Sequence, residues 1–206
     1  MATKSGVIIR EGKQTLDELY TGLSILADVE VLVGFPEETS QRQEDSRETD
    51  DYGKPIKSVE GSDITNAALG YIHDNGAPEV NIPARPFMIP GIEDAEPRIK
   101  NKMAQIANAV VRRGGGLTVI EQGYHQIGLI AKLAIQNKIN EGIPPPLAES
   151  TLIERAKKGR KGAGIELLSR EKGYAPSMDF AKPLVDTGQM RNAVNYVIRS
   201  RKKRKK

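Results

Sequence analysis

The sequence predicts an α+β fold: a small mixed or antiparallel sheet packed against two or three helices. Two segments, residues 29–35 and 194–198, alternate in the manner of half-buried strands. Two longer segments, about residues 92–113 and 117–140, repeat apolar residues with helical spacing. We expect residues 1–198 to form a single domain, because a chain of this length can bury one core.

The composition excludes several classes of site. The 206 residues include no cysteine, which excludes disulfides, thiolate metal sites and cysteine nucleophiles. No run of 18 apolar residues is present, so we predict no membrane-spanning helix and no membrane partner. Only three apolar residues follow the first six positions, too few for a signal peptide, and we expect synthesis in the cytoplasm.

Positive charge is concentrated at the C-terminus. The formal net charge is +4, and seven cations lie in residues 199–206, so residues 1–198 carry a net charge of −3. These cations are Arg199, Arg201, Lys202, Lys203, Arg204, Lys205 and Lys206. Such a basic tail cannot form a core, and it would contact phosphates without reading bases. Its partner is nucleic acid or an acidic protein surface, unless the tail only adds solubility.

In the N-terminal third we expect a strand, a helix, a second strand and a long polar segment. Residues 6–10 are a candidate short strand, and leucines with helical spacing follow at positions 16, 19, 23 and 26. The strand of residues 29–35 ends at Pro36. Residues 36–63 contain nine acidic and four basic residues but few aliphatics. We predict a long acidic excursion there, either mobile or ordered on a neighbouring subunit.

The middle of the chain is predicted to be helical on both sides of a proline-rich loop. Ser62 or Asp63 is a suitable N-cap for a helix that Gly76 ends. Three prolines stiffen residues 77–88, for which we expect an extended, polyproline-like path. The two long helices follow, separated by the three glycines at residues 114–116.

The C-terminal third is predicted to contain shorter elements. Thr151 and Glu154 have the spacing of a capping box, which predicts a helix that starts at Thr151. Residues 157–164 are rich in lysine, arginine and glycine, and we expect a flexible basic loop there. About one helical turn follows at residues 165–169. The last strand, residues 194–198, leads into the basic tail.

No group of residues has the spacing of a catalytic, cofactor or metal site. His73 and His125 lie on different predicted helices, without a second ligand at helical spacing. The acidic residues 37–51 lack calcium-loop spacing, and the glycines at 114–116 follow no strand and precede no Lys-Ser/Thr pair. We therefore predict that the protein is not an enzyme and binds no cofactor.

Three segments together resemble one protein family. They are Asn66–Gly76 (NAALGYIHDNG), Ile82–Met88 (IPARPFM) and Pro183–Val194 (PLVDTGQMRNAV). In order and spacing they resemble the tail-completion or neck proteins of long-tailed bacteriophages, also described as head–tail joining or phage virion morphogenesis proteins. The strand at residues 29–35 lies where this family has its first strand. The acidic excursion is longer than the family usually has, and the basic tail is not typical of it.

The resemblance implies a structural virion protein of the neck or the head-proximal tail end, made in the host cytoplasm. Related proteins form rings, commonly sixfold, around the DNA channel. The expected partners are other copies of the chain and the tail terminator, tail tube or head–tail connector proteins. The tape-measure protein or genomic DNA would lie within reach of the basic tail. The alternative function is a small nucleic-acid-binding protein outside virions, acting through that tail.

The segments of the resemblance supply the candidate contacts with neighbouring subunits or partners, which are Ile82, Pro83, Arg85, Pro86, Phe87, Asp186, Thr187 and Gly188. Arg85 is expected to pair with a carboxylate, for which Asp186 is a candidate. In the alternative, Arg85, Pro86 and Phe87 only fix the loop to the core of their own chain. Thr187 is expected to cap the short helix through Met190, and Gly188 to allow close backbone approach.

Overall fold

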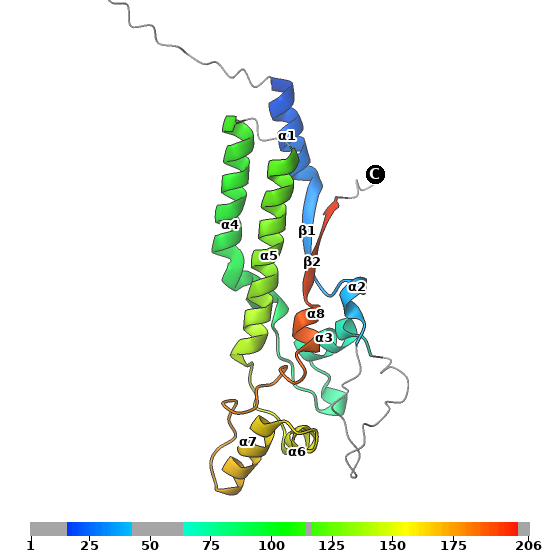
Figure 1. Cartoon of the computed structure of the whole chain (residues 1–206), viewed down its shortest axis with the longest axis vertical. Helices are drawn as coiled ribbons and strands as arrows, with labels where there is room; N and C mark the ends of the chain where they lie inside the picture. The colour runs from blue at the N-terminus through cyan, green and yellow to red at the C-terminus, as the bar shows by residue number, and fades with distance from the viewer. Residues whose placement is uncertain (1–15, 43–63, 114–116, 202–206) are drawn as a thin grey trace, which may run out of the picture.

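The computed structural model describes residues 16–42, 64–113 and 117–201. In this part of the chain, helices and a two-stranded sheet form an elongated molecule (Figure 1). The elements are α1 (Leu16–Asp28), β1 (Val29–Gly34), α2 (Glu37–Ser40), α3 (Asn66–Asn75), the 3-10 turn η1 (Pro78–Val80), α4 (Met88–Arg113), α5 (Leu117–Glu141), α6 (Glu149–Lys157), α7 (Lys161–Glu171), α8 (Gln189–Ala193) and β2 (Asn195–Ser200). The α+β class is confirmed in this general form, a mostly helical chain with a small antiparallel sheet.

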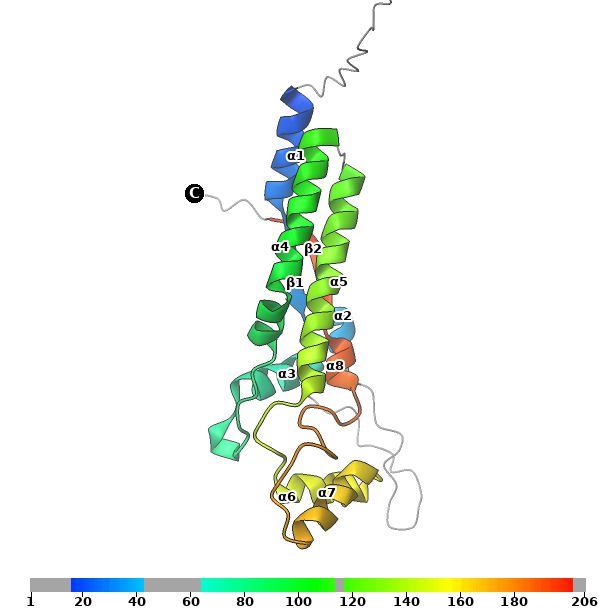
Figure 2. The same ribbon diagram turned by 90° about the vertical axis from the view of Figure 1, so that its left-hand side faces the viewer.

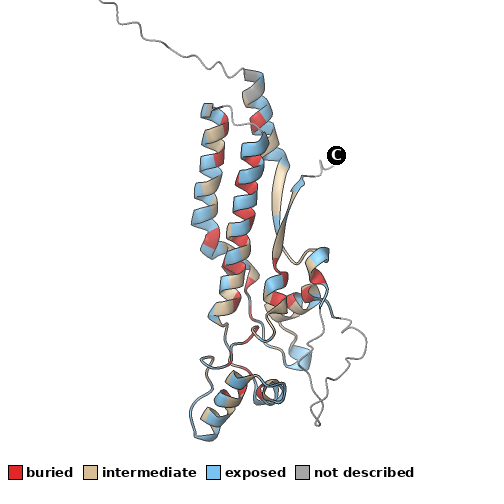
Figure 3. Cartoon of the chain, in the orientation of Figure 1, coloured by how far each residue is buried: buried red, intermediate tan, exposed pale blue. Residues whose placement is uncertain are grey.

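The antiparallel helices α4 and α5 form the long axis of the molecule (Figures 1 and 2). The apolar residues predicted by their periodicity face each other, and the buried positions line the inner side of α5 (Figure 3). This upper core cluster consists of Ile106, Val110, Ile120, Tyr124 and Ile127. Tyr124 also donates a hydrogen bond of 2.7 Å to the carbonyl of Leu26, which ties α5 to α1.

The sheet lies along α5. Strand β1 pairs with β2 in register from Val29↔Ser200 to Gly34↔Asn195, so residues far apart in the sequence are neighbours. Val29, Val31 and Ile198 pack on the upper core cluster, whose members come from α4 and α5. The expected small antiparallel sheet is thus present, and its inner face lies against α5.

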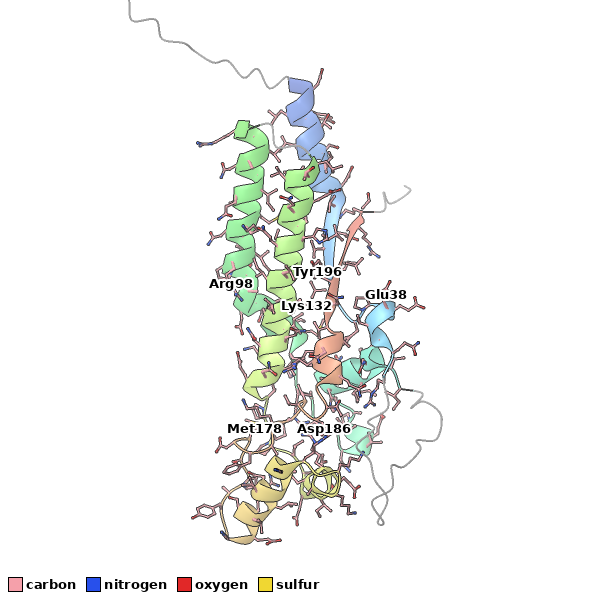
Figure 4. The ribbon with its side chains drawn as sticks, viewed as in Figure 1. Glu38, Arg98, Lys132, Met178, Asp186 and Tyr196 are labelled. Carbon is pink, nitrogen blue, oxygen red and sulfur yellow. The ribbon has the colours of Figure 1, made fainter. Side chains whose placement is uncertain are left out.

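Gly128 allows the sheet to approach α5 closely. A Cβ atom at this position would lie 2.2 Å from the Tyr196 ring, a distance that real Cβ atoms do not show. Tyr196 therefore occupies the space that a side chain on this face of α5 would need. Lys132, one turn further along α5, donates a hydrogen bond of 3.3 Å to Asn195 (Figure 4).

A second, lower core joins the far ends of α4 and α5 to α3 and α8. Its buried members are Phe87, Ile135, Ile139, Leu184, Met190 and Val194. Phe35, which follows β1, packs edge-on against Phe87 with 6.4 Å between the ring centroids. The end of β1 is thereby fixed to the start of α4.

Two predictions for the segment after β1 need correction. Within the expected excursion, residues 37–40 form the short helix α2, because the Thr39 hydroxyl donates a 2.7 Å hydrogen bond to the carbonyl of Ala193. Helix α3 is capped by Thr65, whose hydroxyl accepts a 3.1 Å hydrogen bond from the Ala68 amide, and not by Ser62 or Asp63. The rest of the excursion, residues 43–63, and the candidate strand at 6–10 lie outside the described residues.

The α6–α7 unit differs most from the prediction. Helix α6 begins after Ala148, without the capping box expected at Thr151. The expected basic loop is only a short turn, because α7 begins at Lys161 and not at residue 165. Tertiary contacts stabilise this helix: a small apolar cluster joins the two helices, and Glu166 of α7 is buried. The buried cluster contains Leu147, Leu152, Ala163 and Ala181.

Strand β2 continues two residues beyond the predicted end of the domain. Ser200 pairs with Val29, and the Arg201 amide donates to the carbonyl of Asp28. The first residues of the predicted basic tail therefore belong to the sheet. Among the described helices, none has the length and hydropathy of a membrane-spanning segment.

Candidate functional site

The loop between α3 and α4 folds back on α3. Gly76 ends α3 with a φ of 79°, in the left-handed region that glycine favours. Ala77 and Ile82 then exchange two backbone hydrogen bonds, of 2.8 and 3.0 Å, and the Arg85 amide donates one of 2.7 Å to the carbonyl of His73. Residues 77–82 therefore form a closed turn, and the expected extended path is wrong for this half of the loop.

Asp74 joins the loop to α4. Its Oδ1 accepts hydrogen bonds from the amides of Phe87 (2.7 Å) and Met88 (3.0 Å), at the helix N-terminus where no backbone acceptor is available. A carboxylate at this position also interacts favourably with the helix dipole. This cap explains why α4 begins four residues earlier than its apolar periodicity predicts.

We call residues 82–88 of the loop the first motif and residues 183–190, within the third segment of the resemblance, the second motif; the second motif forms the entry to α8. The N-cap residue of α8 is Gly188, which has no side chain, so the expected cap by Thr187 is wrong. The Thr187 hydroxyl, one residue earlier, accepts a 3.2 Å hydrogen bond from the amide of Gln189, the first residue of α8. Gly188 has a φ of 79°, and the nearest atom to an added Cβ would be 3.6 Å away. Gly188 is therefore required for its backbone conformation, and the expected close approach of another backbone is wrong.

The two motifs meet below the α4–α5 hairpin, although about 100 residues separate them. Both motifs, together with residues of α6, line a hollow of about 510 Å³. We call it the arginine hollow; its charged and motif residues are His73, Ile82, Pro83, Arg85, Glu154, Arg155, Lys158 and Asp186. Thr187 and Gly188 line a smaller adjoining hollow of about 150 Å³. Asp186 lies between the hairpin and α6 (Figure 4).

The remaining members of the first motif lie on opposite sides of the loop. Pro86 is exposed, whereas Phe87 is fully buried in the lower core. The burial of Phe87 favours the alternative in which this residue fixes the loop to its own chain. Ile82 and Pro83, at the hollow, are accessible to a partner.

Arg85 is a buried cation without a carboxylate partner among the described residues. Only 5% of its surface is exposed, its Nη2 donates a 2.9 Å hydrogen bond to the carbonyl of Pro145, and its Nε has no hydrogen-bond partner in the described part of the chain. Asp186, the expected partner, instead accepts a 2.8 Å hydrogen bond from Arg160. The expected pairing of Arg85 with Asp186 is therefore wrong.

Arg155 brings a second guanidinium to the same hollow. Its Nη1 donates to the carbonyls of Lys182 (3.0 Å) and Val185 (2.9 Å), which fixes the start of the second motif onto α6. Burial and the proximity of Arg155 lower the pKa of Arg85. Burial also lowers the pKa of Arg155, an effect that nearby Asp186 opposes and Arg160 reinforces. Positive charge is thus concentrated here at an electrostatic cost.

His73 completes the hollow as a neutral group. Burial, followed by the charges of Arg85 and Arg155, lowers the pKa of His73. Its Nδ1 is buried without a hydrogen-bond partner among the described residues. The sequence analysis did not identify Arg155 and Arg160 as site residues, because basic residues in and after a predicted helix have no spacing that indicates a binding site.

The described start of the basic tail is paired with the sheet. Arg199 Nε lies 2.7 Å from Glu30 Oε1, and Arg201 Nε lies 3.9 Å from Glu30 Oε2. Glu30 therefore offsets part of their positive charge, and Arg199 has a fixed place on β2. The other five cations, Lys202, Lys203, Arg204, Lys205 and Lys206, lie outside the described residues.

No described cluster of three or more His, Asp or Glu side chains has a geometry that holds a metal ion. His125, on α5, lies against the Tyr196 ring with 5.9 Å between the ring centroids, whereas His73 lies on α3. Scans against protein-family models, curated proteins and solved structures found no match for the chain.

Proposed function

We propose that the chain is a structural virion protein of a long-tailed phage. In this proposal it assembles as a ring, sixfold as is common among the proteins it resembles, at the neck or the head-proximal tail end. The ring completes the tail and helps to join it to the head around the DNA channel. The three segments that carry the resemblance support the proposal, because they form one continuous structural unit: Asp74 of the first caps α4 at the second, and the third lines the hollow beside them.

The main support for ring formation comes from the two-stranded sheet. Among the described residues, β1 and β2 pair only with each other, so each strand has one edge without a backbone partner there. Such an edge is a template for pairing with another chain. On the outer face, Leu32 and Val197 are opposite each other, and each is 41% exposed. An apolar outer face beside open edges favours contact with a second copy.

The hydrogen-bond register identifies the groups that point outward. The Arg201 amide donates to Asp28, so these two residues form a hydrogen-bonded pair, and such pairs alternate along an antiparallel ladder. Residues 29, 31 and 33 of β1 and 196, 198 and 200 of β2 therefore direct their amides and carbonyls away from the partner strand. If β1 of one copy pairs with β2 of the next, the contact is heterologous, and it forms a ring when the rotation between successive copies closes on itself.

A proline at Ser200 tests this contact with little damage to the core. Ser200 is exposed, and its amide points to the open edge, so Ser200→Pro removes an outward donor but no ladder hydrogen bond. Ser200→Ala keeps the amide and is the matched control. We expect native mass spectrometry of the full chain to show a closed ring for the wild type and for Ser200→Ala, and a smaller ring fraction for Ser200→Pro.

The other outcomes separate the elements of the proposal. A ring that is unaffected by Ser200→Pro would mean that subunits meet through other surfaces. A monomer that binds duplex DNA in a salt-dependent manner would refute the ring and favour the non-virion nucleic-acid-binding alternative. Purified particles of its phage should contain about one ring of this chain. If the chain is absent from the particles, or if its copy number far exceeds one ring, the assigned position is wrong.

A further inference from the structure

We propose that the arginine hollow is a binding site for a carboxylate on an acidic peptide segment, held between Arg85 and Arg155. The inference concerns a site within one chain and does not depend on ring formation. Its basis is a concave surface lined by the buried guanidinium of Arg85, the half-buried guanidinium of Arg155 and the half-buried, neutral imidazole of His73, which come from three separate segments of the chain.

The charges of the hollow are unbalanced. Both carboxylates at its rim already have cationic partners: Glu154 lies 2.9 Å from Lys157, and Asp186 lies 2.8 Å from Arg160. The hydrogen bonds of Arg85 and Arg155 go to neutral backbone carbonyls. Buried cations are normally paired with anions, so the hollow has the electrostatic character of an anion site.

Arg85 has the geometry for an additional hydrogen bond. Its guanidinium has five N–H groups, and the Nε group is buried without an acceptor among the described residues. Guanidinium groups bind carboxylates through two parallel hydrogen bonds, which are among the strongest polar contacts in proteins. A carboxylate that enters the hollow would give Arg85 the anionic partner that Asp186 does not provide.

The rest of the lining favours a peptide over a phosphate. Apolar side chains surround the guanidiniums, and their surface matches the methylene groups of an acidic side chain; they are Ile82, Pro83, Pro145, Pro146, Leu147 and Leu184. A dianionic phosphate would be repelled by Asp186 and Glu154 more strongly than a carboxylate with a single charge. The volume of about 510 Å³ is within the range of specific ligand sites.

Matched small ligands test the charge requirement directly. The ligands are N-acetylglutamate amide, its neutral analogue N-acetylglutamine amide, and inorganic phosphate, each titrated into the full chain at constant ionic strength. We expect a saturable rise in melting temperature with the glutamate derivative, a smaller one with phosphate and none with the glutamine derivative. Isothermal titration calorimetry then supplies the dissociation constants.

Three variants locate the site. Arg85→Gln removes the charge but retains an amide donor, and Lys158→Glu reverses an exposed charge at the rim. We expect each to weaken binding of the glutamate derivative at least tenfold. Arg98→Gln, an exposed position on α4 far from the hollow (Figure 4), is the control and should bind like the wild type. If Arg85→Gln fails to fold, binding to Lys158→Glu still tests whether the ligand occupies the arginine hollow.

Three results would overturn the proposal. Equal stabilisation by the glutamate and glutamine derivatives would show that the hollow does not recognise a carboxylate. Tighter binding of phosphate than of the glutamate derivative, lost in the same variants, would identify a phosphate site and hence a different class of partner. Loss of binding in Arg98→Gln to the same extent would place the interaction outside the hollow.

Discussion

The Asp74 cap is a single contact whose loss should be measurable across the whole molecule. Asp74→Ala removes the acceptor for two amides at the start of α4, which costs about 0.5–2 kcal/mol for a helix N-cap. Loss of the charge near the helix N-terminus adds about 0.3–1 kcal/mol. We therefore expect a loss of about 2 kcal/mol in the free energy of unfolding, which corresponds to a decrease in melting temperature of about 4–8 °C for a chain of this size.

Two further variants separate the acceptor from the charge. Asp74→Asn keeps an oxygen acceptor and loses only the charge, so it should cost about 0.3–1 kcal/mol. The control is Asp94→Ala, which removes an exposed carboxylate of α4 that pairs with Lys138 of α5. It should lower the free energy of unfolding by less than about 1 kcal/mol. Urea unfolding monitored by circular dichroism measures all three. Asp74→Ala within about 0.5 kcal/mol of the wild type, or equal to Asp74→Asn, would refute the cap.

Two other predictions concern the sheet and the α6–α7 unit. Gly128→Ala should destabilise the protein by about 1–3 kcal/mol in thermal unfolding, because the added Cβ would overlap Tyr196. The control is Gly164→Ala on α7, where an added Cβ has no atom within 4 Å. Equal melting temperatures of the two variants would contradict the close packing of the sheet on α5. Burial raises the pKa of Glu166, but hydrogen bonds from Ser177 and Arg170 outweigh it, so the folded-state pKa lies below the ordinary 4.5. The ionised carboxylate therefore stabilises the fold above pH 4.5, and this contribution is lost as the pH falls through the folded-state pKa. Glu166→Gln should have a lower free energy of unfolding than the wild type at pH 7, and this difference should become smaller as the pH falls. A difference in the free energy of unfolding that does not change with pH would refute this role of Glu166.

Periodicity predicted the elements whose stability depends on their own apolar faces. The leucines of α1, the alternating valines of β1 and the long stripes of α4 and α5 all indicated their structures correctly. The end of α3 before Gly76 also followed from the position of this glycine after the helical pattern. In each of these cases the information lies within a few residues of the element itself.

Elements that depend on distant partners could not be predicted in this way. Helix α7 contains three glycines or alanines within a basic stretch, and it is held by contacts such as Glu166 with Ser177. The candidate site shows the same limit. The sequence singled out Arg85 and Asp186, and the structure brings both to one hollow, but their partners Pro145 and Arg160 depend on how α6 and α7 fold.

The register of the sheet also determines when the molecule can be completed during synthesis. The α4–α5 hairpin joins helices that are neighbours in the chain, so its contacts are available once residue 141 has been made. Strand β1 is made early, yet its ladder partner is residues 195–200. A nascent or truncated chain without those residues therefore has no β1–β2 ladder and no β2 edge, so only a chain that includes residues 195–200 would have both edges of the proposed ring contact.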